Sequence, residues 1–207
     1  FDSQISGNIL VSGIDFPLQV SGDIEIVKAR SISEFDFREN VSILKRRSYQ
    51  TDLNPHNKIM DLNLRVRADK SISINNRNIQ GDVSLDFLIK GNESYPIING
   101  RLEVDRGKFI YKRDFTLTQG LFTFDDPLRI NPKIDMSAYA DISTYRVTIS
   151  VTGRSSEPII DLSIDPPVRD DGTPISKISI LTLLSSGSLP ESSGELINSS
   201  GTASTEA

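Results

Sequence analysis

The sequence predicts an all-β protein: a long antiparallel meander of strands followed by one short C-terminal helix. In residues 100–153 almost every second residue is apolar, and Gly, Asp, Asn or Pro stands wherever the alternation breaks. A period of two places apolar side chains on one face of a pleated sheet and polar side chains on the other. The first 165 residues show no 3.6-residue period over the ~10 residues that a globular helix needs. Together these observations predict roughly a dozen strands that share one apolar face.

Turn-forming residues separate the alternating segments before residue 100. Gly13 indicates one turn, Asn75-Asn76 supplies another, and Pro55 excludes a central strand from the stretch around it. The phase of the alternation slips within residues 31–37, so the strand expected there is irregular. The expected strands of this region cover residues 5–11, 18–26, 31–37, 60–68, 72–74 and 79–89.

The alternation continues through a central stretch and one more strand. Asp165-Pro166-Pro167 ends that last strand, because proline cannot donate a hydrogen bond to the ladder. The expected strands of this region cover residues 102–104, 109–111, 115–117, 122–124, 134–142, 145–151 and 160–164.

The pattern changes near the C-terminus. Ile178, Leu181 and Leu184 are spaced three apart and follow Ser176, a suitable N-cap, so a short helix is expected. Beyond the helix the chain is rich in Ser, Gly, Thr and Glu, a composition that is typical of poorly ordered segments. We therefore expect a single domain over residues 1–187 and a flexible tail over residues 188–207, both belonging to a longer parent chain.

Composition narrows the classes of function. The net charge of -5 and the lack of a basic face argue against a nucleic-acid partner. The chain contains no cysteine, so disulfides, thiolate metal sites and cysteine nucleophiles are excluded. No apolar run reaches the ~18 residues that are needed to span a bilayer. An apolar content of 37% suits a long sheet with only one dry face.

Candidate catalytic and metal-binding residues are few. The single histidine, His56, stands in a Pro-Asn turn and has no cysteine with which to form a zinc site. The carboxylate pairs Asp125-Asp126 and Asp170-Asp171 lie beside Pro or Gly, where solvated turn residues are expected rather than a calcium site. The sequence therefore predicts no enzyme, no metal site and no cofactor.

The apolar face can be covered in two ways. In a β-sandwich or a closed barrel, two parts of the sheet would face each other and fill an ordinary core. In an open, curled sheet, the same face would line a groove for another molecule. Composition alone favours the sandwich. Against it, apolar positions recur evenly from strand to strand and continue to the start of the chain, as in an extended repetitive structure, so both alternatives stay open at this point.

An ordered set of motifs resembles the C-terminal domain of the TamB family, the translocation and assembly module subunit. The resemblance covers about 90 residues, from a Gly-initiated strand at Gly100 to a Leu-Leu-Gly segment. In the family further strands follow that segment, whereas here a Ser/Gly-rich tail follows. The matching elements between these ends are a G-x-F-x-F strand (Gly120, Phe122, Phe124), Asn131-Pro132 before an alternating strand, a β-branched strand ending in Gly153, and the segment Leu183, Leu184, Gly187.

The resemblance implies a fold, a location and partners. TamB-like proteins are AsmA-like bridges that are anchored in the inner membrane and extend through the periplasm of a Gram-negative-type envelope. They meet an outer-membrane insertase-type barrel, TamA in the family, and are associated with phospholipid transport and with assembly of outer-membrane proteins. A member would form a taco-like half-pipe with its apolar face inward.

A groove of this kind would hold phospholipid acyl chains along a stripe rather than at one binding residue. The alternative role is that of a chaperone or assembly factor, in which an open sheet edge pairs with an incoming outer-membrane strand by β-augmentation, together with a TamA-like partner. The residues expected to line the groove are Leu102, Val104, Phe109, Tyr111, Phe122, Phe124, Met136, Ala138, Val147, Ile149, Leu162 and Ile164.

Overall fold

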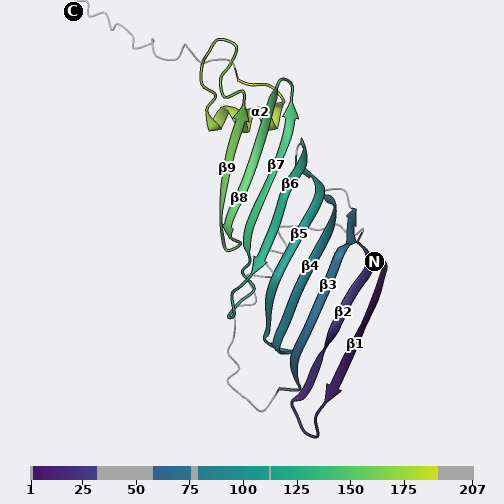
Figure 1. The fold of residues 1–207 in the computed structure, drawn as a ribbon. Helices are drawn as coiled ribbons and strands as arrows, with labels where there is room; N and C mark the ends of the chain where they lie inside the picture. The colour runs from purple at the N-terminus through teal and green to yellow at the C-terminus, as the bar shows by residue number, and fades with distance from the viewer. Residues whose placement is uncertain (1, 32–57, 76–78, 112, 191–207) are drawn as a thin grey trace, which may run out of the picture.

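The computed structural model describes residues 2–31, 58–75, 79–111 and 113–190. Within these residues nine strands form one sheet in chain order, and a short helix follows the last strand (Figure 1). The elements are β1 (Asp2–Ser12), β2 (Leu18–Ser31), β3 (Met60–Asn75), β4 (Ile79–Asn92), β5 (Pro96–Tyr111), β6 (Arg113–Phe124), β7 (Lys133–Ile142), β8 (Tyr145–Arg154), β9 (Glu157–Asp165) and α2 (Lys177–Ser186).

The strands confirm the all-β prediction. The sheet that they form is open, so the sandwich alternative is wrong. Each strand pairs with its neighbours in sequence, and β1 and β9 are the two edges. No second sheet faces the first among the residues that the structure describes, so the sheet is neither a sandwich nor a closed barrel. The short C-terminal helix is also confirmed.

One strand pair departs from the expected antiparallel meander. β2 and β3 are parallel, with Val20 opposite Leu62 and Ile24 opposite Val66. Parallel neighbours require a long crossover connection, and the chain supplies one between Ser31 and Met60. The other seven pairs are antiparallel, as predicted.

Bulges interrupt the pairing along one line across the sheet. In β3 the residues Asp69–Ser71 lie opposite the single residue Ser84 of β4. Arg106 is the extra residue of β5, and the register between β6 and β7 shifts at Thr118. Lys70 and Arg106 adopt positive φ angles of 50° and 44°, which side chains other than glycine rarely do. The single extra residues in β5 and β6 change which residues share a face, so the apolar positions move from even to odd numbers in β5 and back to even numbers in β6. The two extra residues in β3 leave its apolar positions even-numbered.

Several sequence predictions fall outside the described residues. They are the strand at 31–37 beyond Ser31, the turn at Asn76, the histidine His56, and the tail from residue 191 onward. Leu189, in the first part of the expected tail, packs against the hydrophobic cluster described below.

Candidate functional site: an apolar sheet face

Directly paired residues build a continuous apolar face. Leu102 of β5 lies opposite Leu85 of β4 and Phe122 of β6, and Phe122 in turn lies opposite Ile134 of β7. Residues that are directly opposite each other in a ladder point to the same side of the sheet. Further paired positions on this side are Val66 with Phe87, Val83 with Val104, Phe109 with Phe115, Ala138 with Ile149 and Leu162, and Val147 with Ala140 and Ile164. We call this side the apolar face.

Gly100 brings two phenylalanines together in the middle of the apolar face. It lies between Phe87 of β4 and Phe124 of β6 in the register. The two rings form an edge-to-face pair with centroids 5.0 Å apart and an interplanar angle of 76°. Gly100 has φ +138°, and a Cβ there would lie 2.0 Å from the carbonyl oxygen of Asp86. Only glycine therefore fits, and the flanking rings cover the space above it.

A second aromatic pair belongs to the most buried part of the face. The rings of Phe109 and Phe115 are stacked 4.8 Å apart, with an interplanar angle of 5°. Phe115 is 1% exposed and Val147 is 0% exposed. This end of the face is closed by α2, whose Ile180 and Leu183 are buried in the same cluster. The cluster consists of Phe115, Ala138, Ala140, Ile142, Val147, Ile180 and Leu183.

Capping hydrogen bonds define both ends of α2, and a side chain of β6 contacts its C-terminal end. The Ser176 side chain accepts a hydrogen bond from the Ser179 amide, as the N-cap prediction required. Gly187 ends the helix with φ 87°, and its amide donates to the Leu183 carbonyl. Arg113 of β6 donates to the Leu184 carbonyl at 3.3 Å, which places a cation at the negative end of the helix dipole.

The three-residue spacing of apolar residues predicted the helix, but it does not show which side of the helix is buried. Ile178 and Leu181 are 76% and 54% exposed, whereas Ile180 and Leu183 are buried. All five apolar residues of α2 are spread around the helix, so a three-residue spacing can be traced on more than one side. Nothing in the sequence indicates that α2 packs on the apolar face.

The residues expected to line a groove divide into two groups. Leu102, Val104, Phe122, Phe124 and Met136 lie half-buried on the apolar face, apart from the cluster that α2 joins. Ala138 and Val147 belong to the cluster itself, whereas four others pack against it while half-buried: Phe109, Ile149, Leu162 and Ile164. The backbone of Tyr111 ends β5, and its side chain lies outside the described structure.

Residues on β3 and β4 belong to the same face and were not among the expected lining residues. Leu62, Leu64, Val66 and Ala68 alternate along β3, and Leu85 and Phe87 continue the face on β4. The signal that identifies them is the same two-residue period that predicted the strands.

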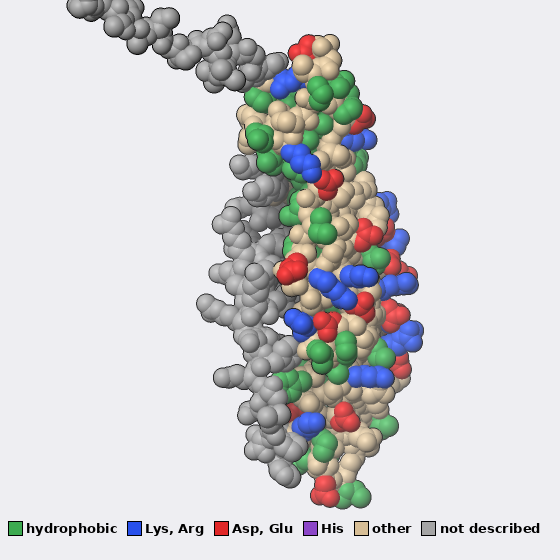
Figure 2. Space-filling model, turned by 90° about the vertical axis from the view of Figure 1, so that its left-hand side faces the viewer, with side chains coloured by type: hydrophobic (Ala, Val, Ile, Leu, Met, Phe, Trp, Pro, Cys, Tyr) green, Lys and Arg blue, Asp and Glu red, His purple; other side chains and the backbone are tan. Residues whose placement is uncertain are grey.

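The opposite side of the sheet is charged. Glu25, Arg67, Asp86 and Arg101 lie directly opposite one another on β2, β3, β4 and β5, so charges of opposite sign alternate across four strands. In Figure 2 cationic and anionic side chains are intermingled along one long margin of the molecule. We call this side the charged face.

Ion pairs hold the carboxylates of the charged face in their ionised form. The Arg65 guanidinium donates to both carboxylate oxygens of Asp86, at 3.1 and 2.9 Å, and lowers the pKa of that carboxyl. The Lys70 ammonium lies 2.6 Å from a carboxylate oxygen of Asp105 and lowers its pKa likewise. These groups are solvent-exposed, so each pair contributes little to the stability of the fold.

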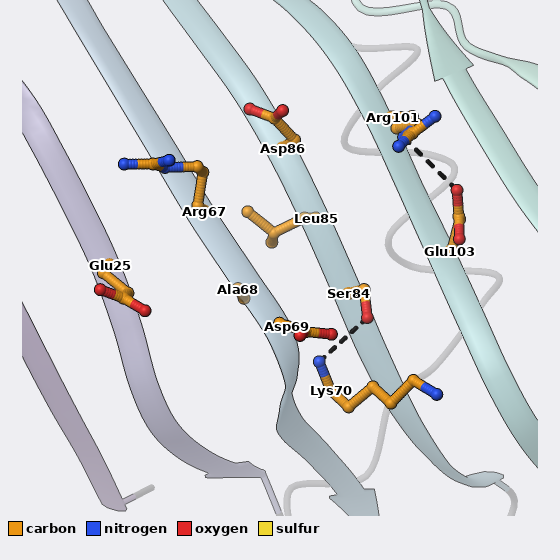
Figure 3. Close-up of a pocket in the computed structure, with 10 residues that line it drawn as sticks. All are labelled: Glu25, Arg67, Ala68, Asp69, Lys70, Ser84, Leu85, Asp86, Arg101 and Glu103. Atoms are coloured by element: carbon orange, nitrogen blue, oxygen red, sulfur yellow. Dashed lines mark hydrogen bonds and ion pairs between the residues drawn. The ribbon is translucent and has the colours of Figure 1, made fainter.

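A hollow on the charged face lies where β3 bulges (Figure 3). The Lys70 amide donates to the Ser84 hydroxyl at 2.9 Å, and the guanidinium of Arg101 lies 3.4 Å from a carboxylate oxygen of Glu103. Because the cations Lys70, Arg67 and Arg101 each have a carboxylate partner, the hollow offers no surplus positive charge to an anion. The apolar face is therefore the better candidate site.

Neither face presents a metal centre in the described part of the chain. No group of three or more His, Asp or Glu side chains converges there. No helix among the described residues is long and apolar enough to cross a membrane.

Comparison with known families agrees with this architecture. The family model described as the TamB C-terminal domain matches residues 1–207, which is the whole chain. No curated protein matches the sequence.

Proposed function

The chain belongs to the TamB family, and from this premise we propose that its apolar face carries phospholipid acyl chains through the periplasm between the inner and outer membranes. Membership in the family supports a role in outer-membrane assembly or lipid transport, together with TamA, and a location in the cell envelope. The finer proposal concerns the cargo. The single observation that supports it is an open sheet with one face apolar from β3 to β9 and the other face charged.

The energetics of acyl-chain transfer favour such a face. Burial of one methylene is worth ~0.8 kcal/mol, so exposure of a chain of about sixteen carbons to water would cost on the order of 13 kcal/mol. Leu, Ile, Val and Phe side chains offer the chain an environment close to that of the bilayer interior. Transfer along the sheet is then nearly thermoneutral, and the polar head group stays in water at the open side.

Two consecutive residues of β7 provide a matched test. Met136 lies on the apolar face, opposite Gly120 and Val151, and Ser137 lies on the other face, opposite Gln119 and Ser150. We expect Met136→Lys to abolish lipid recovery from the purified protein, because a charge on the apolar face must contact acyl chain. Ser137→Lys adds the same charge to the same strand and is expected to retain the lipid. Met136 is preferred to Ile149, which packs against the α2 cluster and would also report on stability.

The measurement is mass spectrometry of lipids extracted from the two purified variants and the parent protein. Equal phospholipid recovery from all three proteins would contradict the proposal. Circular dichroism of both variants verifies that the strands remain paired.

A second candidate function rests on the edge strand β9. Ile159 and Ile160 are 66% and 63% exposed on this nine-residue edge. An exposed edge with apolar side chains can add a strand from another chain, so β9 suits β-augmentation of an outer-membrane barrel strand. Recovery of a bound barrel peptide without lipid would favour this role over acyl-chain transport.

A further inference from the structure

The apolar face is not uniform, because α2 covers one end of it. Ala138, Ala140 and Val147 line a strip under the helix that continues the row of Phe122, Ile134 and Met136 without a polar interruption. Among the described elements, α2 is the one that packs onto this face from outside the sheet. The helix thus occupies a surface of the kind that the proposed function assigns to acyl chains.

The strip under α2 has small side chains at its centre and bulkier ones around them. Its central residues, Ala138 and Ala140, are small and almost completely buried, at 1% and 2% exposed. Bulkier residues stand around them, including the stacked pair Phe109 and Phe115. Ile180 and Leu183 complete the cluster from the helix, so two aliphatic side chains now fill the space above the alanines.

Side-chain contacts attach α2 to the sheet. The buried Ile180 and Leu183, the half-buried Leu184 and the hydrogen bond from Arg113 to the Leu184 carbonyl anchor a helix of ten residues, which is too short to be stable by itself in water. The ion pair between Lys177 and Asp161, 2.7 Å apart, is exposed on both sides. The connection from β9 to the helix is exposed at nearly every position from Pro166 to Pro174. None of these contacts belongs to the strand ladder, so departure of the helix from the strip would break no strand pair.

We infer that the strip under α2 is a second acyl-chain site, and that α2 is its intramolecular competitor. This inference rests on the proposed function. The ligand class is a single unbranched acyl chain, which would take the places of Ile180 and Leu183 above Ala138 and Ala140. When α2 is seated, the apolar face reaches β9 along the row of Met136, Val151 and Ile160. When α2 lifts, the strip beside that row becomes available as well.

A crosslink that holds α2 in place tests the inference. The natural chain has no cysteine, so Asp161→Cys together with Lys177→Cys gives one unique pair of thiols. A short bismaleimide joins them and locks the helix, whereas the same variant capped with N-ethylmaleimide is the unlocked control. Both forms are irradiated with a diazirine-bearing hexadecanoic acid, and labelled residues are identified by mass spectrometry.

We expect the capped form to be labelled both on Leu102 or Phe122 and on the strip of Ala138, Ala140 and Val147. Locking should reduce labelling of the strip by about tenfold or more and leave labelling of Leu102 and Phe122 unchanged. Equal labelling of the strip in both forms would overturn the inference, because α2 would then not compete. Labelling of Leu102 and Phe122 alone in the capped form would overturn it too, and would leave the proposed function intact. Absence of labelling at all of these residues would refute both.

A pair of helix variants gives an independent measurement. Leu183→Asp removes the buried anchor and is expected to raise labelling of the strip, whereas Ile178→Asp changes an exposed residue of the same helix and is expected to have no effect. An equal increase in labelling of the strip in both variants, or no increase in either variant, would contradict the role of α2.

Discussion

Gly100 is the position at which one added methyl group should disturb the apolar face most. A Cβ built there lies 2.0 Å from the carbonyl oxygen of Asp86 and 3.0 Å from the Cα of Phe87, and both atoms belong to the backbone of β4. Neither can move aside as a flexible side chain would. The substitution Gly100→Ala must therefore displace β4 from β5, and with it the ring of Phe87 from that of Phe124.

Two terms set the magnitude. A non-glycine residue at φ +138° carries backbone strain of about 1–2 kcal/mol, and overpacking against fixed atoms costs about 1–3 kcal/mol. The expected destabilisation of Gly100→Ala is therefore about 2–5 kcal/mol, a large part of the ~5–15 kcal/mol that a domain typically has.

Gly172 offers a matched control. It also has a positive φ, of +82°, but a Cβ there would meet no atom within 4 Å. Gly172→Ala should therefore show the strain term alone, about 1–2 kcal/mol. Urea unfolding of both variants, followed by far-ultraviolet circular dichroism, gives the two free energies of unfolding. If Gly100→Ala costs no more than Gly172→Ala, the close approach of β4 and β5 and the aromatic pair above it are not what holds this part of the sheet.

Three further predictions concern the rest of the fold. Phe115→Ala should destabilise the protein by about 3–5 kcal/mol in urea unfolding, because it removes a fully buried ring stacked on Phe109, and a smaller loss would mean that the cluster under α2 can collapse. Glu93 accepts hydrogen bonds from the backbone amides of Ile59 and Met60 at 2.9 and 3.0 Å, and these bonds lower the pKa of its carboxyl. Glu93→Gln should therefore lower the urea midpoint at pH 7, whereas near pH 3 the midpoints of the variant and the parent protein should be equal. A difference in midpoint that persists in acid would exclude the charge as the cause. The lowered carboxyl pKa values of the charged face contribute stability above the unfolded-state pKa of ~4, so the urea midpoint should fall as the pH drops from about 5 to below 3, and a midpoint that rises in acid would contradict the paired geometry.

The two-residue period of the apolar residues predicted most of the fold. It indicated where the described strands lie and which side of each strand faces the apolar surface, because burial of one face constrains every second residue. It divided β3, β5 and β6 into two segments each, whereas the structure has each of them as one strand with a register shift. Even the change of parity between Val104 and Phe109 is visible in the sequence, and the structure explains it by the bulge at Arg106. The bulge itself was not foreseeable, since arginine is an unusual residue at φ 44°.

The two-residue period could not predict contacts between segments that are far apart in the sequence. The parallel pairing of β2 with β3 depends on where the chain returns after the connection from residue 32 to residue 59, and no local pattern specifies that return. The position of α2 on the apolar face depends on Ile180 and Leu183 fitting a strip of small residues from β7. The three-residue spacing of Ile178, Leu181 and Leu184 predicted a helix but could not show which side it buries.

Contact between acyl chains and the apolar face can be measured directly with a single tryptophan, because the natural chain has none. Phe122→Trp places the reporter on the apolar face opposite Leu102, and Thr123→Trp places it on the charged face opposite Arg101. The protein is mixed with phospholipid vesicles whose acyl chains carry bromine, which quenches indole fluorescence on contact. Our account predicts strong quenching at position 122 and little at position 123. Equal quenching at both positions, or none at position 122, would contradict it.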